Sequence, residues 1–566
     1  MVDFIWVAVF AGFALWWMGV YALNKAGVLK RFNMTAYGPL IMWRTYRGQG
    51  LLNSLASPKT FWKALFSLCI PLVFVSMVIM LAMIVIVDIV MIVKTPAPSV
   101  ATAPQNILVI PGVNQFVPFV WGWLALVVAM VVHELGHAVM ARAENIKVKS
   151  MGLLLAPIPI GAFAEIDEEE MFGTKSEGTT GEVLGPMDTK GAGEGKRTAS
   201  SMGQVRILSA GVISNFLIAA LAFLLLFGPV LGAIAATNSG MVVVNVAPGT
   251  PAYDAGIHSN MIINSVDGVN MSTPGQFNDY LRAHAGSTVD IQGMQGSQAV
   301  SYPIKVNETK GLYVLGVVAD FPAAKAGIGP NMQMVSVNST PISNNAEYTA
   351  FMANTTPGQT VSVDLVAQNG TMMNTSMVLA SGAQPKGYMG FGGADLSDNS
   401  IGILVGTFDA RGQLSALQSM LSPTGNTIVD KAMSVVEGLA VIMFMPLWEV
   451  MGGYTGISVF QSDLASLYHP IGWAAGLGNG VFYMALALFW IGWLNMNVGL
   501  FNCLPMIPLD GGHIFREVTR VTVGRFVRDG KTVDRISKAI VNGFAITLFS
   551  SLVFMIVAPY IVHGLA

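Results

Sequence analysis

Six long apolar segments constrain the fold of this chain more than any other feature of its sequence. They lie at 4–23, 64–93, 117–141, 207–233, 480–503 and 541–562. A helix needs about 20 apolar residues to cross the hydrocarbon core of a bilayer, and each segment meets that length. Hydrophobic residues make up 53% of the 566 and charged residues only 11%, which excludes an ordinary soluble protein. The sequence predicts a polytopic α-helical membrane protein with about six transmembrane helices.

The distribution of basic residues predicts the orientation of these spans. Seven Lys and Arg residues lie in 25–63 and seven more in 516–538, whereas 451–515 contains none. Cytoplasmic loops are the ones enriched in Lys and Arg. We therefore expect the N-terminus and residues 234–430 outside the cell, and we interpret the apolar segment 433–450 as interfacial or re-entrant. The lack of sorting motifs favours a prokaryotic cell membrane.

The third span carries a pattern typical of zinc sites. His133, Glu134 and His137 form His-Glu-x-x-His within 117–141. A spacing of four residues places both imidazoles on one face of a helix, where they can share a metal ion, with Glu134 beside them as a general base. Ionisable groups in an apolar span are costly, and a divalent cation offsets that cost. The alternative is a pair of histidines that are hydrogen-bonded in a bundle core.

A catalytic zinc site needs a third protein ligand and leaves its fourth position to water. The best candidate is Asp510, in the segment 502–512, where two prolines forbid a regular helix. The predicted topology brings this segment to the same cytoplasmic end as His137. Cys503 in this segment and His513 directly after it are rival ligands, and a solvated Asp510 in an ordinary Pro-Gly loop is the other alternative.

The separated motifs resemble those of the site-2 protease family of intramembrane zinc metalloproteases. Residues 133–137 match the family's H-E-x-x-H, and 502–511 match its N-x-x-P-x-x-P-x-D-G element with the spacing intact. Residues 209–215 resemble its A-G-P-x-x-N element, with Val212 where proline is usual. The likeness covers the core of the chain, about 117–233 and 480–520.

The resemblance implies a zinc metalloendopeptidase that cuts peptide bonds within or near transmembrane segments, in regulated intramembrane proteolysis or in signal-peptide removal. It assigns Zn²⁺ to His133, His137 and Asp510, and the role of base to Glu134. Expected partners are single-span membrane-protein substrates and the lipid bilayer, and no nucleic acid. A catalytically inactive scaffold and a transporter with a structural metal site are the alternatives.

Further candidates would hold the substrate backbone. The segment 151–165 is too short and too Pro-rich to cross a membrane, so we expect it to dip in as hairpin strands whose edge binds an unwound substrate. Gly161 and Phe163 are its candidate residues. Asn215 and Asn502 are the candidates on the core helices, although a buried Asn more often forms a helix–helix hydrogen bond. Interfacial packing is the alternative role of the hairpin.

An internal repeat occupies the longest segment between spans. The sequence Pro-Ala-Tyr-Asp-Ala-Gly-Ile at 251–257 recurs as Pro-Ala-Ala-Lys-Ala-Gly-Ile at 322–328. Each unit resembles a PDZ domain. We expect two tandem PDZ-like modules, 236–308 and 309–382, that form an inserted extracytoplasmic α+β region and bind a peptide at a sheet edge. The alternative is a pair of β-rich units without a ligand groove.

The motifs predict seven parts. Residues 1–116 form N-terminal transmembrane helices, and 117–235 form a first part of the catalytic membrane core, which holds the His-Glu helix, the hairpin, a cytosolic Gly-rich loop and a core helix. The two PDZ-like modules follow at 236–308 and 309–382, and a linker with the interfacial segment occupies 383–479. Residues 480–520 form the second part of the core with the Asp-Gly motif, and 521–566 form a C-terminal transmembrane helix. We expect the catalytic centre toward the cytoplasmic side.

Overall fold

The computed structural model describes most of the chain. The described residues are 2–45, 49–96, 103–107, 109–156, 158–172, 199–237, 240–246, 250–296, 298–306, 312–318, 321–329, 332–367, 371–381, 386–395, 401–452 and 456–564. The chain forms two compact units. One unit comprises Met1–Leu226, Ala440–Met451 and Leu486–Ala566, and the other comprises Phe227–Leu439 and Gly452–Ala485. Most of the predicted Gly-rich cytosolic loop falls outside the described residues.

Five helices of the described chain are long and apolar enough to cross a membrane. They are α4 (Lys59–Val93), α6 (Phe119–Ala143), α8 (Ser201–Leu225, continued by irregular turns to Ala233), α15 (Gly480–Asn502) and α17 (Gly530–His563). Five of the predicted spans fall in these helices, which confirms a membrane protein. The first predicted span lies in α1 (Val2–Lys25), and the total of six stays a prediction.

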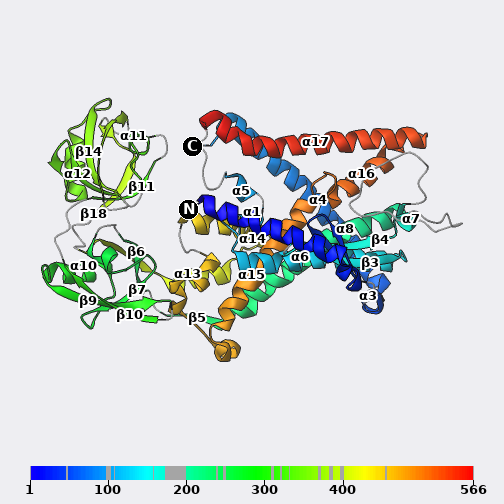
Figure 1. Ribbon diagram of the computed structural model, residues 1–566, viewed down its shortest axis with the longest axis horizontal. Coiled ribbons are helices and arrows are strands. Elements are labelled where there is room, and N and C mark those ends of the chain that lie inside the picture. The colour runs from blue at the N-terminus through cyan, green and yellow to red at the C-terminus, as the bar shows by residue number, and fades with distance from the viewer. Residues whose placement is uncertain are drawn as a thin grey trace. The chain divides into compact units, whose positions relative to one another are not determined.

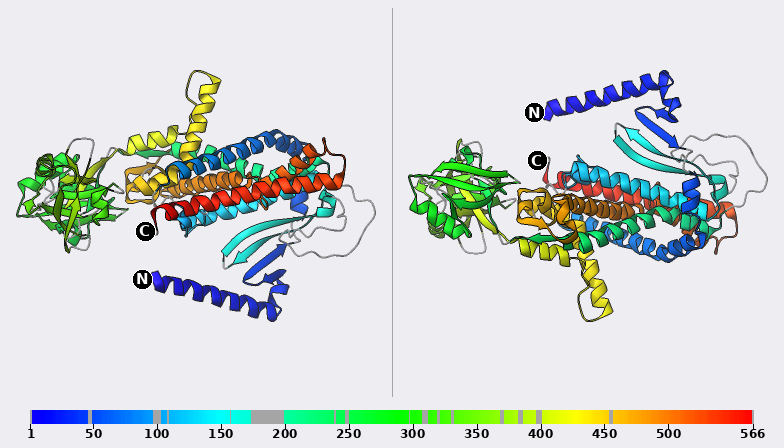
Figure 2. Two further views of the ribbon diagram at one scale, coloured as in Figure 1. Left: turned by 90° about the horizontal axis from the view of Figure 1, so that it is seen from above. Right: turned by 90° about the horizontal axis from the view of Figure 1, so that it is seen from below.

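Helices α4, α6, α8 and α17 run side by side in a bundle (Figures 1 and 2). Small residues permit the close approach of α6 and α8. A Cβ on Gly136 of α6 would lie 2.7 Å from the carbonyl oxygen of Ala210 on α8. Similarly, a Cβ on Gly499 of α15 would lie 2.7 Å from the ring of Phe216. Glycine at these two positions lets the helices pack closely enough to form a site between them.

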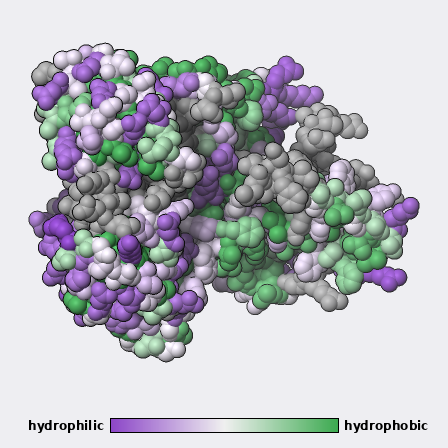
Figure 3. Space-filling view, turned by 60° about the vertical axis from the view of Figure 1, so that its left-hand side comes forward, coloured by the Kyte–Doolittle hydropathy of each residue, from purple (hydrophilic) through white to green (hydrophobic). Residues whose placement is uncertain are grey.

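The outer face of the helices is apolar. Large side chains such as Leu68, Ile92 and Leu224 are at least 70% exposed. In the face of the molecule shown in Figure 3, hydrophobic residues gather over the helical part, whereas the sheet-bearing part is mixed and largely hydrophilic. An exposed apolar surface of this extent matches the hydrocarbon of a bilayer.

A four-stranded sheet belongs to the helical unit. Its strands are β1 (Met34–Tyr37), β2 (Leu40–Thr45), β3 (Val148–Ala156) and β4 (Ile158–Ile166), in the order β1-β2-β3-β4. The hairpin predicted within 151–165 is therefore present as β3 and β4. The two additional strands were not expected from the sequence. They come from the N-terminal region, and β2 pairs with β3 from Ile41 with Leu155 to Thr45 with Met151. Strand β4 ends the sheet and packs against α6.

The other unit contains two sheets of the same design. The first has the order β10-β9-β7-β6-β19, with β6 (Gly240–Val246), β7 (Ile262–Val266), β8 (Val269–Asn270, paired with β7), β9 (Thr288–Gln295), β10 (Gln298–Lys305) and β19 (Ile403–Phe408). The second has the order β15-β14-β12-β11-β18, with β11 (Leu312–Val317), β12 (Gln333–Val337), β13 (Thr340–Pro341, paired with β12), β14 (Thr360–Val366), β15 (Met372–Val378) and β18 (Phe391–Asp395). Helices α10 (Pro274–Ala283) and α12 (Asn345–Ala353) occupy equivalent places.

The two modules are nested in the chain rather than strictly tandem. Strand β18 pairs with β11 to complete the second sheet, and β19 then returns to pair with β6 of the first. The predicted boundaries at 308 and 382 therefore each leave out one strand, and the predicted linker 383–479 contains both. Pairing across the inserted module depends on contacts far apart in sequence, which the local repeat does not reveal.

The rest of the described chain consists of short elements and one long helix. The segment 433–450 lies within α14 (Ile428–Gly452), which contains Pro446, and its placement at the interface stays a prediction. The other α-helices and strands are α2 (Val28–Arg31), α3 (Gln49–Leu55), α5 (Pro104–Ile107), α7 (Glu168–Phe172), β5 (Ile234–Ala236), α9 (Pro251–Asp254), α11 (Pro322–Lys325), β16 (Ala380–Ser381), β17 (Gly387–Tyr388), α13 (Ala410–Ser419), β20 (Tyr468–Pro470) and α16 (Asp510–Val523). Three short 3-10 helices, Gly456–Gln461, Asp463–Leu467 and Gly472–Leu477, lie between α14 and α15.

Candidate metal centre

Helix α6 presents two imidazoles from one face, as its sequence predicts. The Nε2 atoms of His133 and His137 lie 3.2 Å apart, and both residues are buried. The rings are nearly perpendicular, with centroids 4.8 Å apart. Their facing nitrogens converge on one point beside the helix instead of pointing toward separate partners.

Asp510 completes the group from the other part of the core. Its Oδ2 lies 3.0 Å from Nε2 of His133 and 3.2 Å from Nε2 of His137. Asp510 is the first residue of α16. The two glycines that follow it fit tightly, because a Cβ on Gly511 or Gly512 would collide with the backbone of the preceding loop. The loop sequence therefore fixes the carboxylate against the histidines.

These donors fit a zinc ion. One ligand atom from each of His133, His137 and Asp510 lies within 4.8 Å of the others, and two imidazole nitrogens with one carboxylate oxygen form a zinc-type set. Within the described chain, neither Cys503 nor His513 joins this group. Gly211 of α8 keeps the adjacent space clear, since a Cβ there would lie 2.6 Å from Nε2 of His133.

Helix α8 contacts the outer nitrogen of each imidazole. Nδ1 of His137 lies 2.7 Å from the carbonyl oxygen of Ile207. A carbonyl only accepts, so this nitrogen carries the proton and Nε2 of neutral His137 keeps its lone pair. Nδ1 of His133 lies 3.3 Å from the side-chain amide of Asn215. Asn215, expected to hold substrate, thus faces a histidine.

Glu134 connects the histidines to the hairpin. Its Oε2 accepts a hydrogen bond of 2.8 Å from the backbone N–H of Ala164 on β4. Ala164 was missed by the sequence analysis, because a backbone donor leaves no sequence signal. Since backbone groups alternate between the two sides of a strand, the N–H and C=O of Ala162 face the same free edge.

The other predicted substrate-binding residues lie differently. Gly161 pairs with Leu154 and Phe163 pairs with Gly152 in the β3–β4 register, so by alternation their backbone groups point to β3. A role of Gly161 and Phe163 in substrate binding stays a prediction. Asn502 ends α15, and in the described chain no hydrogen bond joins it to the three candidate ligands.

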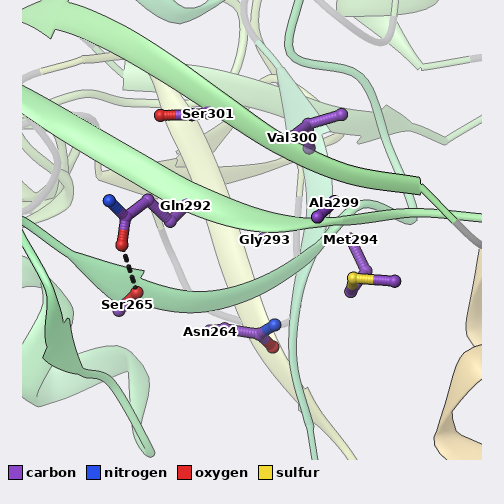
Figure 4. Close-up of a pocket in the computed structure, with 8 residues that line it drawn as sticks. All are labelled: Asn264, Ser265, Gln292, Gly293, Met294, Ala299, Val300 and Ser301. Atoms are coloured by element: carbon purple, nitrogen blue, oxygen red, sulfur yellow. Dashed lines mark hydrogen bonds between the residues drawn. The ribbon is translucent and has the colours of Figure 1, made fainter.

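A separate hollow lies on the first sheet of the other unit. It measures about 370 Å³ and is lined by residues of β7, β9 and β10, including Asn264 and Ser301 (Figure 4). Ser265 donates a hydrogen bond of 2.8 Å to Gln292 at one end of it. None of the predicted site residues lines this hollow, and the acidic and imidazole groups needed for a metal are not among its lining residues.

Comparison with protein families shows the family to which the chain belongs. Residues 121–542 match the model of peptidase family M50, the site-2 protease family. The chain belongs to peptidase family M50. The match spans the proposed base and all three candidate ligands, and it confirms the family expected from the motifs. This M50 peptidase is therefore a zinc metalloprotease that works within the membrane.

Individual proteins resemble this M50 peptidase to different extents. A putative zinc metalloprotease of Neisseria meningitidis is 24% identical over 431 residues, which cover 69% of this chain and 88% of that protein. The protease RseP of Yersinia pestis is 23% identical over 70% of this chain and 89% of its own length. An uncharacterized protein of Methanocaldococcus jannaschii is 31% identical over 155 residues, where the chain spans 40% of that protein.

Proposed function

We propose that this M50 peptidase hydrolyses peptide bonds within or beside the transmembrane segments of single-span membrane proteins. Zn²⁺ is held by His133, His137 and Asp510, and Glu134 is the general base. The observation that carries the proposal is the convergence of two Nε2 atoms and one carboxylate oxygen at 3.0–3.2 Å, from α6 and the start of α16. A scaffold or a transporter would not require Glu134 at this point.

A bound zinc ion would polarise the scissile carbonyl and lower the pKa of a coordinated water. Glu134 takes a proton from the attacking water and delivers it to the leaving amine. The hydrogen bond from Ala164 N–H holds the Glu134 carboxylate toward the edge of β4. This orientation places the base between the metal ligands and the strand on which we propose the substrate lies.

The free edge of β4 is the proposed substrate platform. A transmembrane helix has its carbonyls hydrogen-bonded internally, so it must unwind before a peptide bond can be attacked. An unwound segment can add to a sheet edge through main-chain hydrogen bonds. The N–H and C=O of Ala162 supply the pairing groups next to Ala164 and Glu134. Pairing there would bring the substrate backbone beside the base.

The two nested modules are proposed to be PDZ-like and to act on the extracytoplasmic side. The support is their repeated design and the position of an edge strand beside a helix in each, β19 beside α10 and β18 beside α12. A strand edge next to a helix is where PDZ domains take a peptide. The basic segments 25–63 and 516–538 support a catalytic centre toward the cytoplasm of a prokaryotic cell.

Cleavage by the purified protein in liposomes tests the proposed function. Tagged single-span substrates are incubated with wild type and Glu134→Gln, and bound zinc is quantified in both. We expect both proteins to hold zinc and only wild type to cut. Glu437→Gln, which changes an exposed glutamate of α14, is the matched control and should cut normally. Cleavage that persists in Glu134→Gln, or wild-type protein without zinc, would overturn the proposal.

A further inference from the structure

We infer that Asn215 is a positioning residue for the metal centre, and that its side-chain oxygen holds the proton of His133 on Nδ1. This inference rests on the proposed function, because it concerns how His133 becomes a zinc ligand. It gives Asn215 a different role from the substrate contact expected from the sequence.

The contact between the two side chains is buried. Asn215 lies on α8 with none of its surface exposed, and its Nδ2 is 3.3 Å from Nδ1 of His133. Its Oδ1 is buried and has no hydrogen-bond partner in the described part of the chain. A buried polar atom without a partner costs about 1–3 kcal/mol. In this arrangement Oδ1 of Asn215 is therefore a buried acceptor without a donor in the described part of the chain.

The tautomer of His133 depends on which amide atom faces it. If Nδ2 donates to Nδ1, neutral His133 must carry its proton on Nε2, the nitrogen that faces Asp510, and that nitrogen cannot bind a metal. A half-turn of the amide occupies nearly the same space and presents Oδ1 to Nδ1 instead. Nδ1–H then donates to Oδ1, Nδ2 takes the place that Oδ1 held, and Nε2 of His133 keeps the lone pair that zinc requires.

The neighbouring histidine follows the same design. Nδ1 of His137 donates to the carbonyl oxygen of Ile207 at 2.7 Å, which leaves its Nε2 free to bind metal. Ile207 and Asn215 lie about two turns apart on α8. Helix α8 thus determines which nitrogen of each imidazole carries the proton, with a backbone acceptor for His137 and a side-chain acceptor for His133. Only the side-chain acceptor, on Asn215, can be removed by mutation.

Zinc affinity measures this role directly. Wild type, Asn215→Leu and Asn215→Asp are titrated against a competing chelator in detergent. Loss of the outer partner of a histidine ligand typically weakens metal binding about 10- to 100-fold, and we expect that loss for Asn215→Leu. Asn215→Asp keeps an acceptor of the same shape and should bind zinc at least as tightly as wild type.

Controls separate positioning from general damage. Asn497→Leu also removes a buried amide from a core helix. The Nδ2 of Asn497 donates to the carbonyl oxygen of Trp493 on its own helix, at 2.8 Å, and among the described residues no hydrogen bond joins Asn497 to the candidate ligands, so the zinc affinity of this variant should not change. Thermal unfolding in the presence of chelator checks that each metal-free protein is folded. If Asn215→Leu fails to fold, Asn215→Ala takes its place.

Two results would overturn the inference. One is an unchanged zinc affinity in Asn215→Leu, and a raised KM with normal zinc would then favour the substrate-binding role. The other is an Asn215→Asp protein that binds zinc as weakly as Asn215→Leu, because the acceptor would not matter. Failure of the proposed function looks different, since wild type itself would then lack zinc or Glu134→Gln would still cut.

Discussion

Arg206 donates a hydrogen bond from Nε to Oε1 of Glu144 at 2.7 Å, between the first turns of α8 and the end of α6. The other carboxylate oxygen of Glu144 lies 2.8 Å from Nζ of Lys63 on α4. Glu144 and Arg206 side chains are only 10% and 17% exposed. Arg206 immediately precedes Ile207, whose carbonyl orients His137, so this ion pair fixes the backbone that holds one candidate ligand.

Replacing Glu144 with Ala should destabilise the protein. Two cations would lose their shared carboxylate in a largely buried place, and breaking such a pair typically costs about 3–5 kcal/mol. Thermal or denaturant unfolding in detergent measures the loss. The exposed pair of Arg282 and Asp279, 60% and 73% exposed, supplies the comparison, because Asp279→Ala should change stability little. Equal effects of the two substitutions would contradict the assigned role of Glu144.

Replacing Gly211 with Ala should abolish zinc binding and cleavage. The added Cβ would lie 2.6 Å from Nε2 of His133 and would press into the space where the imidazoles meet. Zinc content and peptide cleavage both report the effect. Gly543→Ala is the matched control, because a Cβ there has open space around it. Normal zinc binding by Gly211→Ala would show that the metal does not lie beside this glycine.

Single substitutions should distinguish the three candidate ligands Cys503, Asp510 and His513, which follow α15 in the chain. Asp510→Ala should lose zinc and activity, since its carboxylate is the one that meets the histidines. Cys503→Ser and His513→Gln should retain zinc, because neither side chain belongs to the cluster. Metal analysis of the three purified variants suffices. Zinc loss in Cys503→Ser or His513→Gln, with retention in Asp510→Ala, would reassign the third ligand.

Replacing Ala162 with Pro should impair substrate binding more than folding. Proline lacks the N–H that the free edge of β4 would offer to a substrate strand. We expect kcat/KM to fall at least about tenfold, the equivalent of one lost hydrogen bond of about 1.4 kcal/mol. Ala162→Ser keeps the N–H and should cut at the normal rate. If both variants behave alike, the substrate does not pair at this residue.

The stability of the second module against unfolding should vary with pH because of Asp364. The Ser336 hydroxyl and then the Asn374 amide donate to its carboxylate and hold the pKa of Asp364 below its ordinary value. A lowered folded-state pKa adds stability above the ordinary value of about 3.9, and that stability is lost as the pH falls further. The unfolding temperatures of wild type and Asp364→Asn should therefore differ at neutral pH and converge as the pH falls through the lowered pKa of Asp364. A difference that persists below that pKa would argue against this cause.

Local spacing accounts for the part of the His133, His137 and Asp510 cluster that could be predicted from the sequence. The four-residue interval between His133 and His137 sets one face of a helix whatever the rest of the fold. The proposal of Asp510 as third ligand rested on the prolines and glycines that interrupt the helix after an apolar span, and on the match to a family motif. The contact of Glu134 with Ala164 could not be predicted, because the direction of a backbone N–H depends on the phase of β4 relative to β3.

The sequence by itself determined the membrane class, the helical spans, the metal-binding pattern on α6 and the repeated modules, because apolar length, helical periodicity and repeated segments are local properties of the chain. Only the tertiary structure decided that β2 joins β3, that β19 closes the first sheet after the second module, and that Asn215 faces His133. These arrangements join residues far apart in the chain, and the packing of whole elements selects among many pairings that the local sequence permits equally well.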